Sequence, residues 1–394
     1  MSEKKRVCVF IGSRANYSSL KSVMKALEAA EGFELLVIVG ASALLDRYGI
    51  LANLIKRDGF KIVSKIHMIV EGETPTTMAK STGLCIMETA TVLDNLKPDM
   101  MLVVGDRFEI LGVATAAAYM NIPVVHTMGG EVSGSIDESV RHVVTKISHI
   151  HFPATELSAR RIEYMGELKE NIHVVGCPRI DEVKEILGKK IDVNGSLFKT
   201  GVGIDIDVNK QFLLVLQHPV TTEYGQGREQ IQVTLDVIDK MGINTIMLWP
   251  NVDAGSDDIA RGIRYFRENS RLKHFHLFKN LPMDIFITLM DKCACMVGNS
   301  SAAVREGAFI GVPAVNIGSR QSGRERGKNI IDVVHNKDEI FDGIKLALSN
   351  GRHEQNTLYG NGNAAVKIVE ILSKKNVTIQ KKYVDHPELF SKGK

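Results

Sequence analysis

Residues 101–128 read MLVVGDRFEILGVATAAAYMNIPVVHTM, with an apolar run at each end and a longer segment between them. Continuous apolar runs of this kind are typical of parallel strands that helices cover on both faces. The same alternation extends along the chain through VCVFIG (7–12), LLVIVG (35–40), IHVVG (172–176), FLLVLQHP (212–219), TIMLWPN (245–251), CMVGNS (295–300) and PAVNIG (313–318). It predicts right-handed β–α–β units in doubly wound parallel sheets.

The runs fall into two groups, one ending near residue 176 and the other beginning near residue 212. A polar, glycine-containing stretch between them places a domain boundary at about 182–208. We therefore predict an α/β protein with two Rossmann-like domains that face a cleft, at 1–185 and 205–365, and a loosely held charged tail at 376–394. Ligands of such sheets bind at the carboxyl ends of the strands, so functional residues should follow the runs.

Bulk properties narrow the class of protein. The 394 residues carry a net charge of +3 with mixed signs, which argues against nucleic acid or an anionic membrane as main partner. The chain has no apolar stretch of about 18 residues, and its N-terminal run is too short for a signal peptide. Five scattered cysteines suit a reducing cytosol. We expect a cytoplasmic protein with no metal ligand cluster and no cofactor.

Charged residues follow two strand ends of the first predicted domain. Arg14 lies after the first run, at the start of a helix, where free N–H groups and an arginine suit a phosphate. A plain turn with a surface arginine is the alternative. Asp106 and Arg107 end the run at 101–106. They are either a structural ion pair or an acid–base group beside a phosphate clamp.

The segment that follows PVVHTM is dense in charged residues. Glu131 lies in a glycine-rich loop, and no capping role accounts for it. Ser135 and Glu138 fit a capping box for the next helix. If that helix starts here, Asp137 and Arg141 are neighbours on one helical face.

The second predicted domain offers a histidine and a candidate phosphate loop. His218 follows five apolar residues and can protonate a leaving oxygen or neutralise a phosphate, although a structural role is the alternative. Ser300 and Ser301 offer donors at a helix start, and the Glu306 carboxylate could accept both hydroxyls of a ribose. An ordinary capped helix would look similar. Arg320 lies in a basic loop that could close over a diphosphate or remain a solvated turn.

Seven segments of the chain, in order, resemble one family. They are GDRFE, GGEVSGSIDESVRH, GCPRID, LQHPVTTE, PNVDAGS, VGNSSAAVRE and GSRQSGR. Together they resemble the hydrolysing UDP-N-acetylglucosamine 2-epimerases of sialic acid and related nonulosonate pathways, from about residue 6 to about 373. The resemblance implies the two-domain GT-B fold, with a C-terminal helix near 365–375 that crosses back to the first domain. It also implies a homodimer or homotetramer.

The resemblance further implies the reaction. UDP leaves as the C1–O bond of the amino sugar breaks, a base removes the C2 proton to give 2-acetamidoglucal, and water then adds to give N-acetylmannosamine. The resemblance assigns catalytic roles to Asp106, Glu131, Asp137 and His218. It assigns contacts with the UDP-sugar to Arg14, Ser18, Arg107, Gly176, Asn251, Ser300, Ser301, Glu306 and Arg320. Arg261 and Arg264 resemble the arginines of a CMP-sialic acid feedback site.

Two positions depart from the family pattern. Met128 stands where the family has a glutamate, and Ala43 where it often has a histidine. Because methionine cannot transfer protons, Glu131 or Asp106 would take over that role, or the substrate differs. The alternatives are the same chemistry on UDP-2,4-diacetamido-bacillosamine for legionaminic acid, a GT-B glycosyltransferase, and a nucleotide-sugar binding protein without catalysis.

Overall fold

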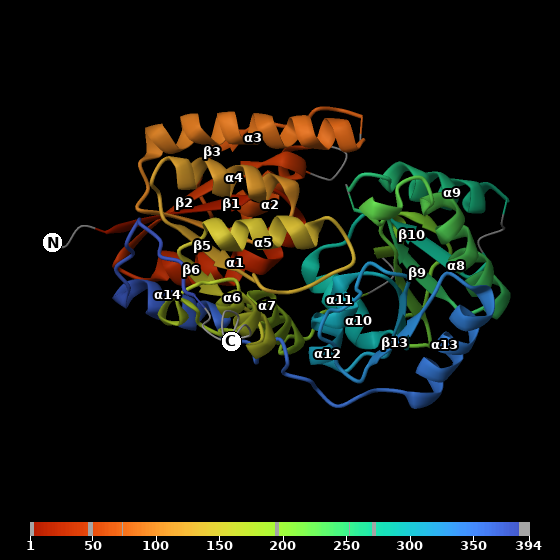
Figure 1. Ribbon diagram of the computed structural model, residues 1–394. Helices are drawn as coiled ribbons and strands as arrows, with labels where there is room; N and C mark the ends of the chain where they lie inside the picture. Colours follow the sequence, from red (N-terminus) through yellow and green to blue (C-terminus); the bar gives the residue numbers. More distant parts are fainter. Residues whose placement is uncertain are drawn as a thin grey trace, which may run out of the picture.

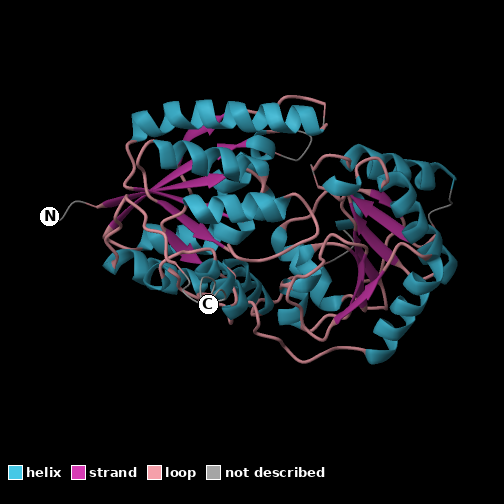
Figure 2. Cartoon of the chain, viewed as in Figure 1, coloured by secondary structure: helices cyan, strands magenta, loops and turns pink. Residues whose placement is uncertain are grey.

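Two sheets, one parallel and one parallel except for a short edge strand, organise the chain in this computed structural model, and each is flanked by helices on both faces (Figures 1 and 2). The structure describes residues 4–45, 50–72, 74–193, 197–251, 253–269 and 273–385. The two domains lie side by side, as predicted. None of the helices in these ranges is long and apolar enough to cross a membrane.

The first domain contains a parallel sheet with the strand order β3-β2-β1-β4-β5-β6. Its strands are β1 (Lys5–Ile11), β2 (Phe33–Gly40), β3 (Ile62–Ile66), β4 (Met100–Val104), β5 (Val124–Thr127) and β6 (Ile150–Phe152). Its helices are α1 (Arg14–Ala29), α2 (Leu51–Arg57), α3 (Pro75–Leu96), α4 (Phe108–Tyr119), α5 (Asp137–Ile147), α6 (Glu156–Tyr164) and α7 (Pro178–Leu187), with the 3₁₀ turns η1 (Ala41–Leu44) and η3 (Lys169–Asn171).

The second domain contains a sheet with the order β13-β12-β11-β8-β9-β10-β7, in which β7 alone runs antiparallel. Its strands are β7 (Val202–Gly203), β8 (Leu213–Leu216), β9 (Thr245–Leu248), β10 (Phe275–Phe278), β11 (Cys295–Gly298), β12 (Ala314–Ile317) and β13 (Ile330–Val333). Its helical segments are η4 (Leu197–Lys199), η5 (Thr221–Glu223), α8 (Gly227–Met241), α9 (Ser256–Asn269), α10 (Met283–Lys292), α11 (Ser301–Val304), α12 (Glu306–Ile310) and α13 (Lys337–Asn350). The last helix, α14 (Ala364–Lys374), packs on the first domain.

The continuous apolar runs are strands that are buried on both faces, as inferred from the sequence. Val7 and Val9 of β1 enter one buried cluster, whereas Cys8 and Phe10, which point the opposite way, enter another. Side chains alternate across a strand, so a strand covered on both faces must be apolar at every position. The run at 172–176 is an exception, because only Ile172 forms a bridge, to His151 of β6. The prediction of a strand there is wrong.

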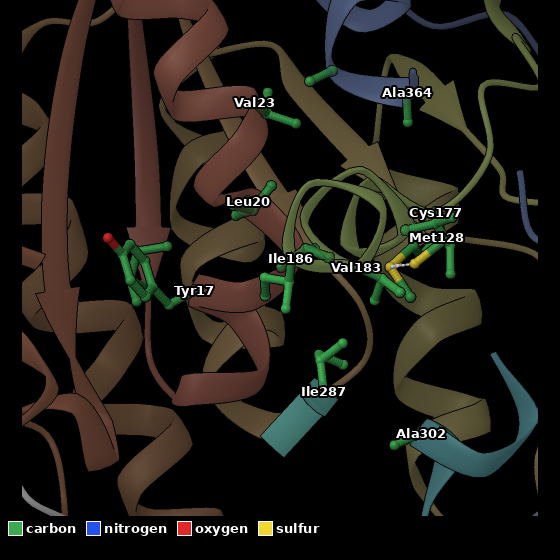
Figure 3. Packing of buried hydrophobic residues seen from close by; sticks show 14 of the residues in the cluster. Tyr17, Leu20, Val23, Met128, Cys177, Val183, Ile186, Ile287, Ala302 and Ala364 are labelled. Atoms are coloured by element: carbon green, nitrogen blue, oxygen red, sulfur yellow. Dashed lines mark hydrogen bonds between the residues drawn. The ribbon is translucent and has the colours of Figure 1, made fainter. Parts of the chain in front are cut away.

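The interior is continuous between the domains. Figure 3 shows Leu20 of α1 and Val183 of α7 near Ile287 of α10, which belongs to the second domain, and all three residues belong to one buried cluster. Burial of apolar surface on both sides of α7 therefore sets the position of one sheet relative to the other.

The C-terminal helix crosses back to the first domain, as the resemblance implied. After α13 the chain returns along the molecule to α14, which packs on α1 and α7 (Figure 1). The Asp181 carboxylate of α7 accepts the backbone N–H groups of Ala364 and Ala365 at 2.9 and 2.8 Å. At the other end, Lys5 Nζ donates to the carbonyl of Leu372 at 3.0 Å. Side chains of the first domain therefore satisfy both ends of α14.

The described part of the predicted tail, residues 376–385, is held more firmly than its composition suggested, and residues 386–394 lie outside the described residues. Lys381 Nζ lies 2.7 Å from the buried Glu167 carboxylate, and the backbone N–H of Val384 donates to the carbonyl of Gly166 at 3.0 Å. His149 Nε2 lies 2.9 Å from the carbonyl oxygen of Ile379. Partners on the first domain, which composition does not reveal, thus fix residues 379–384.

Replacement of Asp181 by alanine should lower the free energy of unfolding by about 1–2 kcal/mol, because the first N–H groups of α14 lose their acceptor. A shift of the chemical denaturation midpoint measures this loss. The control is Asp342→Ala at an exposed position of α13, which should leave the midpoint unchanged. Equal midpoints for the two variants would show that the cap contributes nothing.

Candidate active site

The carboxyl ends of β8 and β11 are tied together at the side of the second sheet that faces the first domain. At Gly298 the backbone has φ +130°, and a Cβ would lie 2.0 Å from the carbonyl oxygen of Leu216, so only glycine fits there. The backbone N–H of His218 donates to Asn299 Oδ1 at 2.7 Å, and Asn299 Nδ2 donates to the carbonyl of His218 at 2.9 Å. This reciprocal pair fixes the backbone of His218.

The imidazole of His218 has a defined tautomer. Its Nδ1 accepts the backbone N–H of Asn251 at 3.2 Å, so the proton of the neutral ring is on Nε2. Burial, followed by the charge of Arg320, lowers the pKa of His218 to about 3. At neutral pH the ring is therefore an uncharged hydrogen-bond donor through Nε2 and not an imidazolium acid.

Asp106 is paired with an arginine from α5. Arg141, whose side chain is 1% exposed, donates from Nε to Asp106 Oδ2 at 2.9 Å and also contacts the same oxygen through Nη2. Arg141 Nη1 donates to the carbonyl of Glu131 at 2.6 Å. Burial by itself would raise the pKa of Asp106, but the charges of Arg141, Arg324 and Arg305 and the hydrogen bond from Arg141 together outweigh burial and hold the pKa at about 2. Asp106 is thus a permanent anion.

Asp137 has the opposite electrostatic environment. Burial raises the pKa of Asp137 to about 7, and the negative charges of Asp106 and Asp253 add to that increase. The helix that it begins has no side-chain cap, because Glu138 accepts the N–H of Ser133 at 2.6 Å instead of forming a capping box. That predicted capping box is therefore wrong. Two neighbouring carboxyl groups with separated pKa values are the usual arrangement for distinct roles in proton transfer.

Asp253 joins cations from both domains. Its carboxylate accepts Arg107 Nη1 at 2.6 Å and the side-chain amide of Asn251, and it lies 3.7 Å from Arg320 Nη2. Arg107 also donates from Nε to Glu109 at 2.8 Å. The structure thus brings together Arg107, Asn251 and Arg320, which are far apart in the sequence. An anionic ligand such as a diphosphate would compete with Asp253 for the two guanidinium groups.

Glu131 forms an ion pair across the domain interface. Its Oε2 accepts Arg305 Nη2 at 2.6 Å and lies 3.3 Å from Arg324 Nη1. Burial opposes ionisation, but these arginines lower the pKa of Glu131 below its ordinary value. A buried carboxylate between two guanidinium groups is held as an anion and ties the glycine-rich loop to the second domain.

A second contact between the domains lies at Glu306. This buried carboxylate accepts Arg179 Nη1 at 2.6 Å through Oε1, and its Oε2 has no hydrogen-bond partner in the described part of the chain. One acceptor is therefore available to a ligand hydroxyl. Ser300 caps the short helix α11 by accepting the N–H of Ala302 at 3.3 Å, and Ser301 is the first residue of that helix.

Three further residues of the first domain were predicted to contact the UDP-sugar: Arg14, Ser18 and Gly176. Arg14 begins α1, and its buried Nε has no hydrogen-bond partner among the described residues, so this cation can bind an anion. Ser18 donates its hydroxyl to the carbonyl of Arg14 at 2.9 Å. Gly176 has φ +91°, and a Cβ there would lie 2.9 Å from Cα of Gly360. The glycine thus permits the close approach of the segment that leads to α14.

The two departures from the family pattern lie in apolar settings. Met128 is buried with φ +62°, an unusual backbone conformation for a residue other than glycine. Its sulfur lies 3.6 Å from the Cys177 thiol (Figure 3). Ala43 is buried in η1 and donates its N–H to the carbonyl of Gly12 at 3.1 Å. Neither side chain can transfer a proton.

Two further predictions concern residues outside this cluster. Arg261 and Arg264 are exposed on α9, where Arg264 lies over the ring of Trp249, 6.0 Å from its centroid. Among the described residues, no group of three or more His, Cys, Asp or Glu side chains is arranged to hold a metal ion.

Four residues of the site were missed as functional groups in the sequence. They are Arg141, Arg179, Asp253 and Arg305, each of which supplies one half of an ion pair. All four lie inside the segments GGEVSGSIDESVRH, GCPRID, PNVDAGS and VGNSSAAVRE that resemble the family. Their place in those segments was the available signal, but it does not reveal the partner of each residue.

The fold and site define a two-domain α/β protein of the GT-B type, with paired carboxyl groups and arginines between the domains. Residues 25–373 match the UDP-N-acetylglucosamine 2-epimerase family, and the chain belongs to this family. It is 34% identical to the UDP-N,N'-diacetylbacillosamine 2-epimerase (hydrolyzing) of Legionella pneumophila, over 93% of this chain and 95% of that protein. It is 30% identical to the UDP-N-acetylglucosamine 2-epimerase of Neisseria meningitidis, over 97% and 99% of the two chains.

The structural comparison agrees with this assignment of the fold. A crystal structure of UDP-GlcNAc 2-epimerase from Neisseria meningitidis bound to UDP-GlcNAc matches with a TM-score of 0.78. The match covers 94% of this chain and all of that chain at 21% identity.

Proposed function

We propose that the protein is a hydrolysing 2-epimerase of a UDP-linked 2-acetamido sugar, which converts UDP-N-acetylglucosamine and water to N-acetylmannosamine and UDP. The observation that carries this proposal is the pair Asp106 and Asp137, with pKa values of about 2 and about 7, beside cations from both domains. A permanent anion next to a carboxyl group that titrates near neutrality suits a reaction that both breaks a glycosyl bond and moves a proton.

The cations would bind the leaving diphosphate. Arg107 and Arg320 already share one carboxylate, and the Nε2–H of His218 adds a neutral donor. When the C1–O bond breaks, its electron pair goes to the diphosphate oxygen, where negative charge develops. Donors held in place by the fold stabilise that charge without reorganisation, which lowers the barrier.

The two aspartates would act on the sugar ring. The Asp106 anion stabilises the positive charge that develops at C1, and Asp137 in its ionised form takes the C2 proton, so that a C1=C2 double bond forms. Water then adds its oxygen at C1 while a proton is delivered to the opposite face of C2. Glu131 is held by Arg305 and Arg324, and Met128 is apolar, so Asp137 is the carboxyl group best matched to this proton transfer.

A second substrate has support from a specific observation. The Legionella pneumophila relative, at 34% identity, is named for UDP-N,N'-diacetylbacillosamine and for hydrolysis. The same bond-breaking steps apply to that sugar, because its C1 and C2 carry the same groups. UDP-N-acetylglucosamine and UDP-N,N'-diacetylbacillosamine are therefore both candidate substrates.

The reaction is tested by incubating the purified protein with each UDP-sugar in deuterated water. We expect UDP to be released without an acceptor, and the free sugar to be inverted at C2 and to carry deuterium there. A product that retains its nucleotide would indicate a non-hydrolysing epimerase. UDP release only with an added acceptor would indicate a glycosyltransferase, and tight UDP binding without any turnover would indicate a binding protein.

Replacement of His218 by alanine should weaken UDP binding about tenfold and slow bond cleavage about a hundredfold, because the Nε2–H donor is lost. Since burial keeps the His218 ring neutral, the variant should keep the same rise of kcat/KM with pH through about 7 as the wild type. Calorimetry with UDP and steady-state kinetics measure these effects. His274→Ala, just before β10 at the amino edge of the same sheet, is the control and should change neither value.

A further inference from the structure

A carboxylate of the protein lies between the two arginines that are proposed to bind the diphosphate. Asp253, in the segment before α9, accepts Arg107 Nη1 at 2.6 Å and lies 3.7 Å from Arg320 Nη2. The side chains of Asp253 and Arg107 are only 10% and 13% exposed. Both residues also line a pocket of about 180 Å³, so a ligand can reach this ion pair. An anion that binds the two guanidinium groups must therefore displace Asp253.

We propose that Asp253 is an internal competitor of the diphosphate, which weakens the binding of UDP and speeds its release after the reaction. The inference rests on the proposed function and deepens it, because it concerns the nucleotide product of the same site. A diphosphate forms strong charge-assisted hydrogen bonds with arginines, and release of a tightly held product limits turnover in many enzymes. A carboxylate of the chain that pairs with the arginines as the diphosphate leaves lowers the barrier to that release.

Both arginines have partners other than Asp253. Arg107 Nε donates to the buried Glu109 carboxylate of the first domain at 2.8 Å. Arg320 Nη1 donates to the backbone carbonyl of Asn299 at 3.3 Å. Loss of the Asp253 charge should therefore leave the two guanidinium groups in place. A residue that only positioned the arginines would have the opposite effect, because its loss would weaken the binding of a diphosphate.

The charges of these groups explain why the competition matters. The guanidinium groups of Arg107 and Arg320 are balanced by two carboxylates, those of Asp253 and of the Glu109 side chain behind Arg107. A diphosphate gains little Coulomb energy from four groups whose charges cancel, and one positive charge is in excess when Asp253 leaves. The displaced carboxylate keeps a donor, because the side-chain amide of Asn251 bonds to its Oδ2. Exchange of Asp253 for a phosphate oxygen thus leaves no charged group unpaired.

The test measures the calorimetric Kd of UDP, inorganic pyrophosphate and uridine for the wild type and Asp253→Asn. The variant should bind UDP and pyrophosphate about tenfold more tightly, because the competing charge is lost. Uridine has no diphosphate, so its Kd should stay unchanged. The dissociation rate of a fluorescent UDP analogue, measured by stopped flow, should also fall about tenfold. Asp257→Asn is the matched control, since Asp257 is exposed in the first turn of α9, and it should alter none of these values.

Asp253→Ala and Asp253→Glu give a second comparison. Alanine removes the charge and should tighten UDP binding, whereas glutamate keeps the charge and should bind UDP no more tightly than the wild type. UDP should also raise the thermal midpoint of the alanine variant more than that of the wild type, which reports affinity in a less stable protein. An unchanged or larger Kd for UDP in the two neutral variants, or an equal change for uridine, would overturn the competitor. Tighter UDP binding without UDP release from either UDP-sugar would contradict the proposed reaction but support the competitor.

Discussion

Asp106→Asn is expected to lower kcat/KM for UDP release about a thousandfold while UDP binding stays within about threefold of the wild type. The amide keeps an oxygen that can accept from Arg141 but loses the negative charge that the proposed mechanism uses to stabilise C1 of the sugar. No hydrogen bond connects Asp106 with a described residue of the second domain, so the variant should leave that domain unchanged. Removal of a negative charge should also not weaken the binding of an anionic diphosphate. Steady-state kinetics and calorimetry with UDP measure the two effects.

The matched control for this variant is Asp99→Asn. Asp99 lies just before β4, at the end of the strand opposite to Asp106, and its Oδ2 accepts the backbone N–H of Arg6 at 2.7 Å. The same change of charge therefore occurs on the same strand but away from the site, and turnover should be normal. Near-normal turnover of Asp106→Asn, with the thermal midpoint of the wild type, would disprove the assigned role.

Asp137→Asn is expected to reduce turnover by a factor of about 10²–10⁴ and to change the shape of the pH profile. The pKa of Asp137 is raised to about 7, so the group is protonated below that pH and ionised above it. A base that must be ionised gives a kcat/KM that rises with pH through about 7. In the asparagine variant this limb should disappear, because an amide does not titrate.

The pH dependence separates a proton-transfer role from a structural one. Asp99→Asn should keep the limb near pH 7, since it leaves the environment of Asp137 unchanged. If Asp137→Asn retained some activity and its kcat/KM still rose with pH through about 7, the group that titrates would be another residue. Loss of the limb together with an unchanged Kd for UDP would support Asp137 as the base.

Much of the fold was predictable from the sequence because local composition records burial on both faces of a strand. The runs 7–12, 35–40 and 101–106 correspond to β1, β2 and β4. Five strands were not identified from the sequence: β3, β6, β7, β10 and β13. β3 and β13 lie at sheet edges and carry exposed charged residues such as Lys65 and Asp332, so their composition is less apolar. β6 and β10 are buried but a histidine interrupts each apolar run, and β7 has only two residues. The apolar run at 172–176 was predicted as a strand, but apart from the bridge of Ile172 it is irregular backbone beside β6.

The sequence predicted which edge of each sheet carries the candidate site, but not which charged residues pair with one another there. Parallel strands place their carboxyl ends at one edge, so the residues after each strand, such as Asp106 and His218, were accessible to reasoning from the sequence. Their partners were not. Arg305 is 174 residues from Glu131, and Asp253 is 146 residues from Arg107.

The sequence by itself determined the two doubly wound domains, the family and the set of charged residues at the strand ends, because these depend on local pattern. Only the tertiary structure decided what each charge does. Asp106 and Asp137 are both aspartates near a strand end, yet one pKa is about 2 and the other about 7. The difference arises from burial and from distances to Arg141 and Asp253, and Coulomb energies depend on separation in space, which the order of residues does not specify.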